Sequence, residues 1–147
     1  MTAPLAGLRV FDMTRVLVGP FATALLADLG AEVIKLEPTH GDDYRRIGPF
    51  RDGESALFLL VNPVKRSVVL DLKAPEGRAI ALDIASKCDV VVENFRPGVS
   101  ERLGLGPGDI RARRPDVVYA RISGFGQDSP WAGRPAYDLS RIIHQGA

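Results

Sequence analysis

The alternation of short apolar runs with longer helical segments is the feature that most constrains the fold of this chain. The helical segments begin at Pro20, Pro75 and Pro107, and the first of them ends at Gly30. The strand candidates are rich in β-branched residues and cover residues 8–13, 33–36, 67–72, 89–93 and 117–122. This alternation predicts an α/β, Rossmann-like fold with a mainly parallel sheet and helices on both faces.

Length, charge and cysteine content narrow the class of protein. The 147 residues predict a single domain over 1–147, and a formal net charge of +1 gives no global field that would attract nucleic acid or an anionic membrane. Neither a signal peptide nor an apolar stretch of transmembrane length is visible, so we expect a cytoplasmic protein. The single cysteine, Cys88, has no neighbouring His or Cys and is interpreted as a packed thiol. No cluster with metal-ligand spacing is present.

Two polar loops are the candidates for a ligand site. Residues 37–55 and 123–136 are rich in Gly, Pro and charge, and each follows a strand candidate. In open α/β sheets, ligands bind beyond the carboxyl ends of the strands. We therefore expect these loops to border the site.

The opening run, residues 8–38, has the strand, turn, helix and strand outline of a dinucleotide-binding unit. The fingerprint of such a unit requires three glycines, whereas this turn contains only Gly19. Val16, Leu17 and Val18 place side chains where a pyrophosphate would have to approach the backbone. The sequence therefore argues against NAD binding, and it contains no phosphate-binding G-K-[ST] loop either.

Six motifs, in the same order along the chain, resemble the class III CoA-transferases, the CaiB/BaiF family that includes formyl-CoA transferase. They read L-A-G-L-R-V-F-D-M-T-R-V-L-V-G-P-F-A-T, L-G-A-E-V-I-K-L-E-P, K-R-S-V-V-L-D-L-K-A-P-E-G, D-V-V-V-E-N-F-R-P-G-V, R-L-G-L and I-S-G-F-G-Q-D-S-P-W-A-G-R-P-A-Y-D. The resemblance implies the N-terminal portion of that fold. It also implies an enzyme that moves CoA from an acyl-CoA thioester to a carboxylic acid, with CoA as substrate and no separate cofactor, in an interlocked homodimer.

The resemblance also implies a set of CoA-binding residues. Val16 and Leu70 would line the adenine, while Lys73, Asn94 and Arg102 would contact the polar parts of CoA. From their positions in the sequence alone, Val16 and Leu70 would be interpreted as core residues, and Lys73 and Arg102 as solvated cations. Asn94 directly follows a strand, so its amide needs hydrogen-bond partners in either interpretation.

Three further residues are candidates for the substrate pocket. Arg45 and Arg46 offer paired guanidinium groups to a substrate carboxylate, although they could instead pair locally with Asp42 and Asp43. Tyr137 could pack over the site, or it could cover the edge of the core.

The six motifs do not include the residue that the resemblance implies as the catalytic nucleophile. In the transferases an aspartate attacks the thioester to form a mixed anhydride, and the resemblance places that residue a few tens of positions beyond the A-Y-D motif. We therefore expect the nucleophile beyond Ala147, a truncated chain that is inactive alone, and for Asp138 either a supporting role or that of a helix N-cap. An α-methylacyl-CoA racemase carries a histidine where this chain has Tyr137. That reading stays an alternative, as does a non-catalytic CoA- or nucleotide-binding module.

Overall fold

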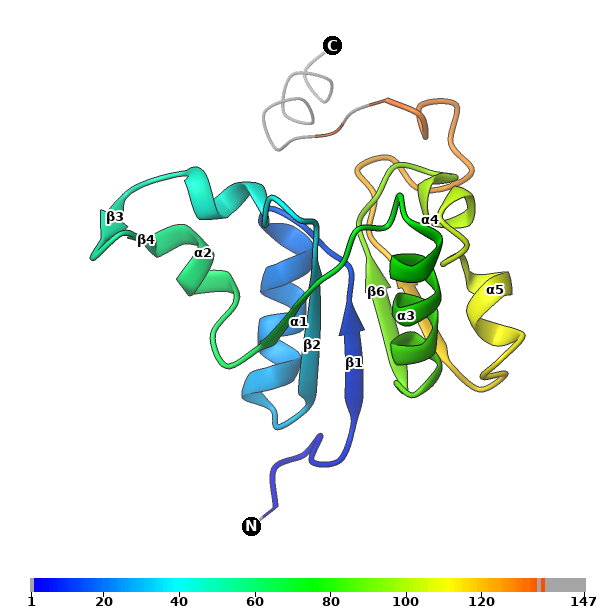
Figure 1. Ribbon diagram of the computed structural model, residues 1–147, viewed down its shortest axis with the longest axis horizontal. Coiled ribbons are helices and arrows are strands. Elements are labelled where there is room, and N and C mark those ends of the chain that lie inside the picture. The colour runs from blue at the N-terminus through cyan, green and yellow to red at the C-terminus, as the bar shows by residue number, and fades with distance from the viewer. Residues whose placement is uncertain (1, 135, 137–147) are drawn as a thin grey trace.

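A five-stranded parallel sheet forms the centre of the computed structural model, which describes residues 2–134 and 136 (Figure 1). Its strands are β1 (Arg9–Asp12), β2 (Glu32–Glu37), β5 (Arg66–Val69), β6 (Val90–Glu93) and β7 (Val118–Arg121). They lie in the order β5-β2-β1-β6-β7, and all neighbours are parallel. The chain winds outward from β1 in one direction and then in the other, as in doubly wound dinucleotide folds. The predicted fold class and all five predicted strands are confirmed.

Helices cover both faces of the sheet, as predicted. On one face, α1 (Val18–Asp28) packs against β1 and β2, while α3 (Pro75–Ser86) and α5 (Pro107–Arg111) lie together on the other (Figure 1). A one-turn helix, α4 (Val99–Arg102), precedes α5. Proline occupies the first turn of α3 and α5, where its missing N–H costs no hydrogen bond. Helix α1 begins two residues before the proline that the sequence suggested.

The two faces of the sheet have separate hydrophobic cores. The larger core joins strand residues such as Phe11 and Leu36 to Ala81, Ala85 and Ile110 of the covering helices. Cys88 is buried in this core, and burial raises the pKa of its thiol to about 11. The thiol is therefore protonated at neutral pH and poorly nucleophilic, which confirms its interpretation as a packed side chain.

The first polar loop contains more regular structure than its composition indicated. A 3₁₀ turn, η1 (Asp43–Arg46), leads into a two-stranded hairpin, β3 (Phe50–Arg51) and β4 (Glu54–Ser55), which is followed by α2 (Ala56–Val61). Figure 1 shows the hairpin and α2 projecting to one side, beyond α1. The hydroxyl of Ser55 caps α2 by accepting a hydrogen bond from the Phe58 N–H at 3.2 Å.

The residues that the structure describes contain neither a membrane-spanning helix nor a group of metal ligands. None of the described helices is both long enough and apolar enough to cross a membrane. Over residues 2–134 and 136, no three His, Cys, Asp or Glu side chains come together as metal ligands.

A buried ion pair joins the start of β5 to β1 and α1. Asp12 ends β1 with no exposed surface, and its Oδ2 accepts hydrogen bonds from Thr23 Oγ1 at 2.6 Å and Lys65 Nζ at 3.0 Å. Lys65 Nζ also donates to the Pro20 carbonyl of α1 at 2.8 Å. Burial lowers the pKa of Lys65, and Asp12 opposes that shift by favouring the ammonium form.

Replacing Lys65 by methionine is expected to lower the free energy of unfolding by about 3–5 kcal/mol, because it leaves the Asp12 carboxylate buried without its counter-charge. Urea denaturation of the variant and the parent measures the difference. Lys87→Met is the matched control, since Lys87 forms an exposed pair with Asp83 and its loss should cost less than about 1 kcal/mol. Equal losses in the two variants would show that the Asp12–Lys65 pair is not what secures this region.

Candidate functional site

A cavity of about 300 Å³ lies at the carboxyl ends of the parallel strands. This strand-end cavity is lined by residues that end or follow β1, β2, β5 and β6, together with one residue from the end of α4: Met13, Arg15, Leu36, Pro38, Thr39, His40, Leu70, Asp71, Leu72, Lys73, Phe95 and Leu103. It includes the point beside β1 where the strand order reverses, which is the usual ligand position in this architecture. Its lining is mainly apolar, and it also contains the cations of Arg15 and Lys73 and one carboxylate, Asp71.

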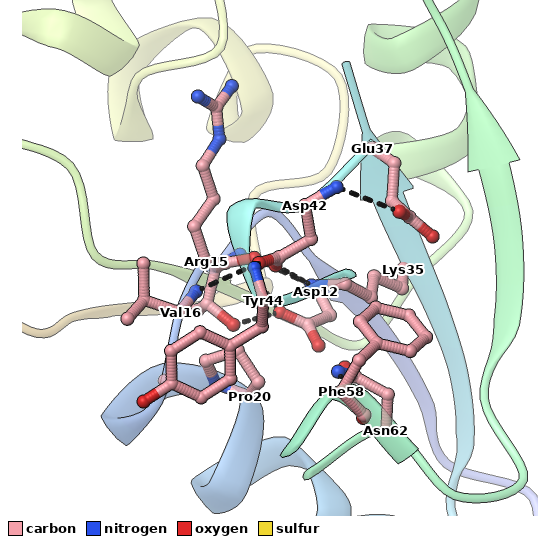
Figure 2. Close-up of polar contacts among 12 residues, drawn as sticks. Asp12, Arg15, Val16, Pro20, Lys35, Glu37, Asp42, Tyr44, Phe58 and Asn62 are labelled. Carbon is pink, nitrogen blue, oxygen red and sulfur yellow. Dashed lines mark hydrogen bonds and ion pairs between the residues drawn. The ribbon is translucent and has the colours of Figure 1, made fainter. Parts of the chain in front are cut away.

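Buried charged side chains fix the turn after β1, which is formed by residues 14–16. The Asp12 carboxylate accepts a hydrogen bond from the Thr14 N–H at 2.9 Å, and Lys35 Nζ donates to the Thr14 carbonyl at 2.9 Å. Lys35 also forms a buried ion pair with Asp42, with 2.9 Å between Nζ and Oδ2. Figure 2 shows Asp12, Lys35 and Asp42 near Val16 of this turn. Thr14 is thereby tied to both β1 and β2.

Two more side chains fix the rest of the same turn. The Asn94 amide pairs with the main chain of Arg15: Oδ1 accepts from the Arg15 N–H at 2.8 Å, and Nδ2 donates to the Arg15 carbonyl at 2.8 Å. Asp42 Oδ1 accepts a longer hydrogen bond, 3.3 Å, from the Val16 N–H. Val16 has φ of 69°, in the left-handed region that β-branched residues rarely adopt. Such a conformation persists only where its surroundings determine it, and these contacts do so.

Glu37 forms a second buried ionic centre at the end of β2. Arg45 holds it with two hydrogen bonds, from Nε at 2.6 Å and from NH2 at 2.7 Å, and Ser67 Oγ donates a third at 2.6 Å. The Asp42 N–H donates a fourth at 3.0 Å. Burial raises the pKa of Glu37, but the bonds from Arg45, Ser67 and Asp42 outweigh it and lower the pKa to about 2. Glu37 is therefore ionised at neutral pH.

The CoA-binding residues predicted from the resemblance gather around the cavity. Leu70 and Lys73 line it, Val16 belongs to the turn from which Arg15 reaches it, and Asn94, which follows β6, is hydrogen-bonded to that turn. Arg102 is exposed at the end of α4, directly before the lining residue Leu103. The contacts of these five residues with CoA stay predictions.

The arginines of the first polar loop have partners other than those suggested by sequence proximity. Arg45 does not pair with Asp42 or Asp43. It forms the bidentate pair with Glu37, and its guanidinium lies 3.7 Å from the centroid of the Phe58 ring. Arg46 NH2 donates to the His40 carbonyl at 2.6 Å. A role of either arginine in binding a substrate carboxylate stays a prediction. Tyr137 and Asp138 lie outside the described residues.

Sequence reasoning missed Arg15 as a member of the site. The residue was treated as part of an apolar turn, although it comes three positions after β1, where ligands bind in such sheets. The position of Arg15 just after a parallel strand could have identified it from the sequence as a candidate site residue. His40 is exposed and also borders the cavity.

Comparison with known proteins gives one consistent result. The model of the family described as CoA-transferase family III matches residues 5–146. The chain is 51% identical over 136 residues to the acetyl-CoA:oxalate CoA-transferase of Acetobacter aceti and 50% identical over 148 residues to the mouse succinyl-CoA:glutarate CoA-transferase. These alignments cover 92% and 96% of this chain but only 35% and 34% of the relatives, so the chain spans about a third of their length. A crystal structure of a CaiB/BaiF family protein from Brucella suis superimposes with a TM-score of 0.92 and 38% identity, covering 99% of this chain and 40% of that one.

The low pKa of Glu37 makes the stability of the fold depend on pH. Because the pKa falls from 4.5 in the unfolded chain to about 2 in the folded protein, Glu37 contributes about 3 kcal/mol above pH 4.5, and this contribution is lost as the pH falls toward 2. Glu37→Gln removes the titrating group. Unfolding free energies measured between pH 6 and pH 2 should therefore fall less steeply in this variant than in the parent. The exposed Glu76→Gln is the control, and a profile for Glu37→Gln as steep as that of the control would contradict the assignment.

Proposed function

The chain belongs to CoA-transferase family III, and on that premise we propose that the protein transfers CoA from an acyl-CoA thioester to a carboxylic acid. The observation that carries the proposal is the strand-end cavity, which combines apolar walls with cationic side chains where a doubly wound sheet binds its ligand. In this proposal the described residues form the site for the nucleotide end of CoA.

The chemistry of CoA suits the two kinds of lining residue. Its adenine needs a flat apolar surface, which Leu70 after β5 and Leu103 after α4 offer, with Val16 in the adjoining turn. Its phosphate groups need cations, and Lys73 stands directly at the cavity with Arg102 beside Leu103. Among the ion pairs of the described residues, none involves Lys73 or Arg102, so neither charge is neutralised by a carboxylate of the protein.

The same carboxylates that organise the site are poorly suited to attack a thioester. Asp12, Glu37 and Asp42 are each buried and each paired with a cation, so none of them is open to an incoming thioester. We therefore assign the covalent step, attack of an aspartate on the thioester carbonyl with expulsion of the CoA thiolate, to the part of the family's fold that this sequence does not span. Asp138 keeps its predicted supporting role. The interlocked homodimer and the cytoplasmic location also stay predictions.

The choice of carboxylic acid is proposed to depend on residues outside this part of the fold. Relatives named for oxalate and for glutarate resemble the chain almost equally, at 51% and 50% identity. A region that selected the acid would be expected to follow one of them more closely. Short dicarboxylic acids are therefore the acceptors to test first.

A transfer assay tests the proposed activity directly. The intact protein that carries this sequence is incubated with acetyl-CoA or succinyl-CoA and with oxalate or glutarate, and the CoA esters are separated by chromatography. We expect a new CoA ester that requires both substrates. If no acid accepts CoA and the protein instead epimerises a 2-methylacyl-CoA, the racemase alternative is the correct one.

Removing the Lys73 charge should weaken CoA binding. Lys73→Ala is expected to raise the dissociation constant for CoA about tenfold, since it deletes one charge-assisted contact with phosphate. Isothermal titration calorimetry of the intact protein gives the constant. Lys87→Ala provides the control, because Lys87 caps the far end of α3 and does not line the cavity. An unchanged constant for Lys73→Ala would remove Lys73 from the site.

A further inference from the structure

We propose that Arg15 binds a phosphate group of CoA, and that Asn94 is a positioning residue that acts on the ligand through Arg15. The inference rests on the proposed function and assigns a recognition role to a residue that the sequence comparison did not single out. It also gives Asn94 a different role from the direct CoA contact that the family resemblance implied.

The side chain of Arg15 is a cation kept at the cavity wall. It is half-buried and lines the cavity, with its guanidinium carbon 5.3 Å from the centroid of the Phe95 ring, another lining residue. Figure 2 shows this side chain extending away from the buried carboxylates of Asp12 and Asp42. The aromatic contact fixes one face of the guanidinium group and leaves its N–H donors for another partner.

The charge of Arg15 is not matched within the described part of the chain. Among the other half-buried arginines, Arg45, Arg114 and Arg121 have the carboxylate partners Glu37, Asp89 and Glu101, whereas Arg78, which does not line the cavity, has none among the described residues. Over residues 2–134 and 136, no ion pair includes Arg15. A planar, permanently charged donor at a cavity wall is well suited to bind phosphate in a bidentate manner.

The contacts of Asn94 explain how this cation is held in place. Its Oδ1 and Nδ2 form two 2.8 Å hydrogen bonds with the N–H and carbonyl of Arg15, so the end of β6 is joined to the main chain of the residue that carries the guanidinium. An aspartate could accept from the N–H but could not donate to the carbonyl, and an apolar residue could do neither. The asparagine therefore sets where the Arg15 side chain starts, while Phe95, the next residue, supports the guanidinium at its other end.

Ligand titrations of the intact protein test the role of Arg15. CoA and dephospho-CoA, which lacks the 3′-phosphate, are titrated into the parent, Arg15→Met, Arg15→Lys and Arg113→Met. We expect Arg15→Met to weaken CoA binding about tenfold, Arg15→Lys to restore it in part, and Arg113→Met, an exposed residue before β7, to leave it unchanged.

The two ligands identify which phosphate is bound. A larger loss for CoA than for dephospho-CoA would place Arg15 on the 3′-phosphate, and equal losses would place it on the pyrophosphate; both results support the proposal. An affinity for both ligands that is the same in Arg15→Met as in Arg113→Met would overturn it. If the parent protein itself binds neither CoA nor dephospho-CoA, the proposed function is wrong. This outcome can be told apart from failure of the Arg15 proposal, because it is seen in the protein without any substitution.

A double-mutant cycle tests the role of Asn94. Asn94→Ala should weaken CoA binding in the parent by a factor approaching that of Arg15→Met, yet it should add less than about a twofold loss when Arg15 is already methionine. Independent, multiplying losses would mean that Asn94 contacts CoA directly, and would overturn its positioning role. Thermal unfolding identifies any variant that fails to fold, and Asn94→Ser, a smaller polar change, then replaces Asn94→Ala in the cycle.

Discussion

The buried charges beneath the first turn determine the geometry of the whole cavity. Lys35 and Glu37 project from the inner strand β2, where apolar residues would be usual, and Asp12 ends the neighbouring central strand β1. A buried ion pair offsets the cost of its desolvation only when its geometry is good and its remaining donors and acceptors are satisfied. The pairs Asp12–Lys65 and Lys35–Asp42 therefore favour a single placement of the turn at residues 14–16.

That placement explains why a dinucleotide-like outline does not produce a dinucleotide site. In such sites, the N–H groups of a glycine-rich turn bind the pyrophosphate. Here the N–H groups of Thr14, Arg15 and Val16 donate to side chains of the protein itself, namely Asp12, Asn94 and Asp42. Because these three backbone donors are already engaged, they are not available to a pyrophosphate. The engaged amides and the missing glycines therefore both argue against a dinucleotide site at this turn.

The strands could be read from the sequence because each is a local run, whereas the site depends on contacts between distant segments. Lys65 meets Asp12 across 53 positions and Asn94 meets Arg15 across 79, so neither pairing leaves a local pattern. Arg45 was predicted as a substrate-pocket residue, with pairing to an adjacent aspartate as the alternative, but it pairs with Glu37, which is already held by its strand and needs less ordering to bind it. Helix α2 was not predicted, because it directly follows a polar loop and is only six residues long.

The charge of the cavity is a local property that the composition of the chain does not reveal. The formal net charge of +1 provides almost no long-range field, so an anion is not drawn to this protein as a whole. Around the cavity, however, the buried carboxylates are neutralised by Lys65, Lys35 and Arg45, while Arg15 and Lys73 remain at its walls. Pairing the buried acidic groups internally leaves Arg15 and Lys73, together with the exposed carboxylate of Asp71, as the charged side chains at the cavity wall. The local distribution of charge around the cavity therefore differs from what the net charge of the chain suggests.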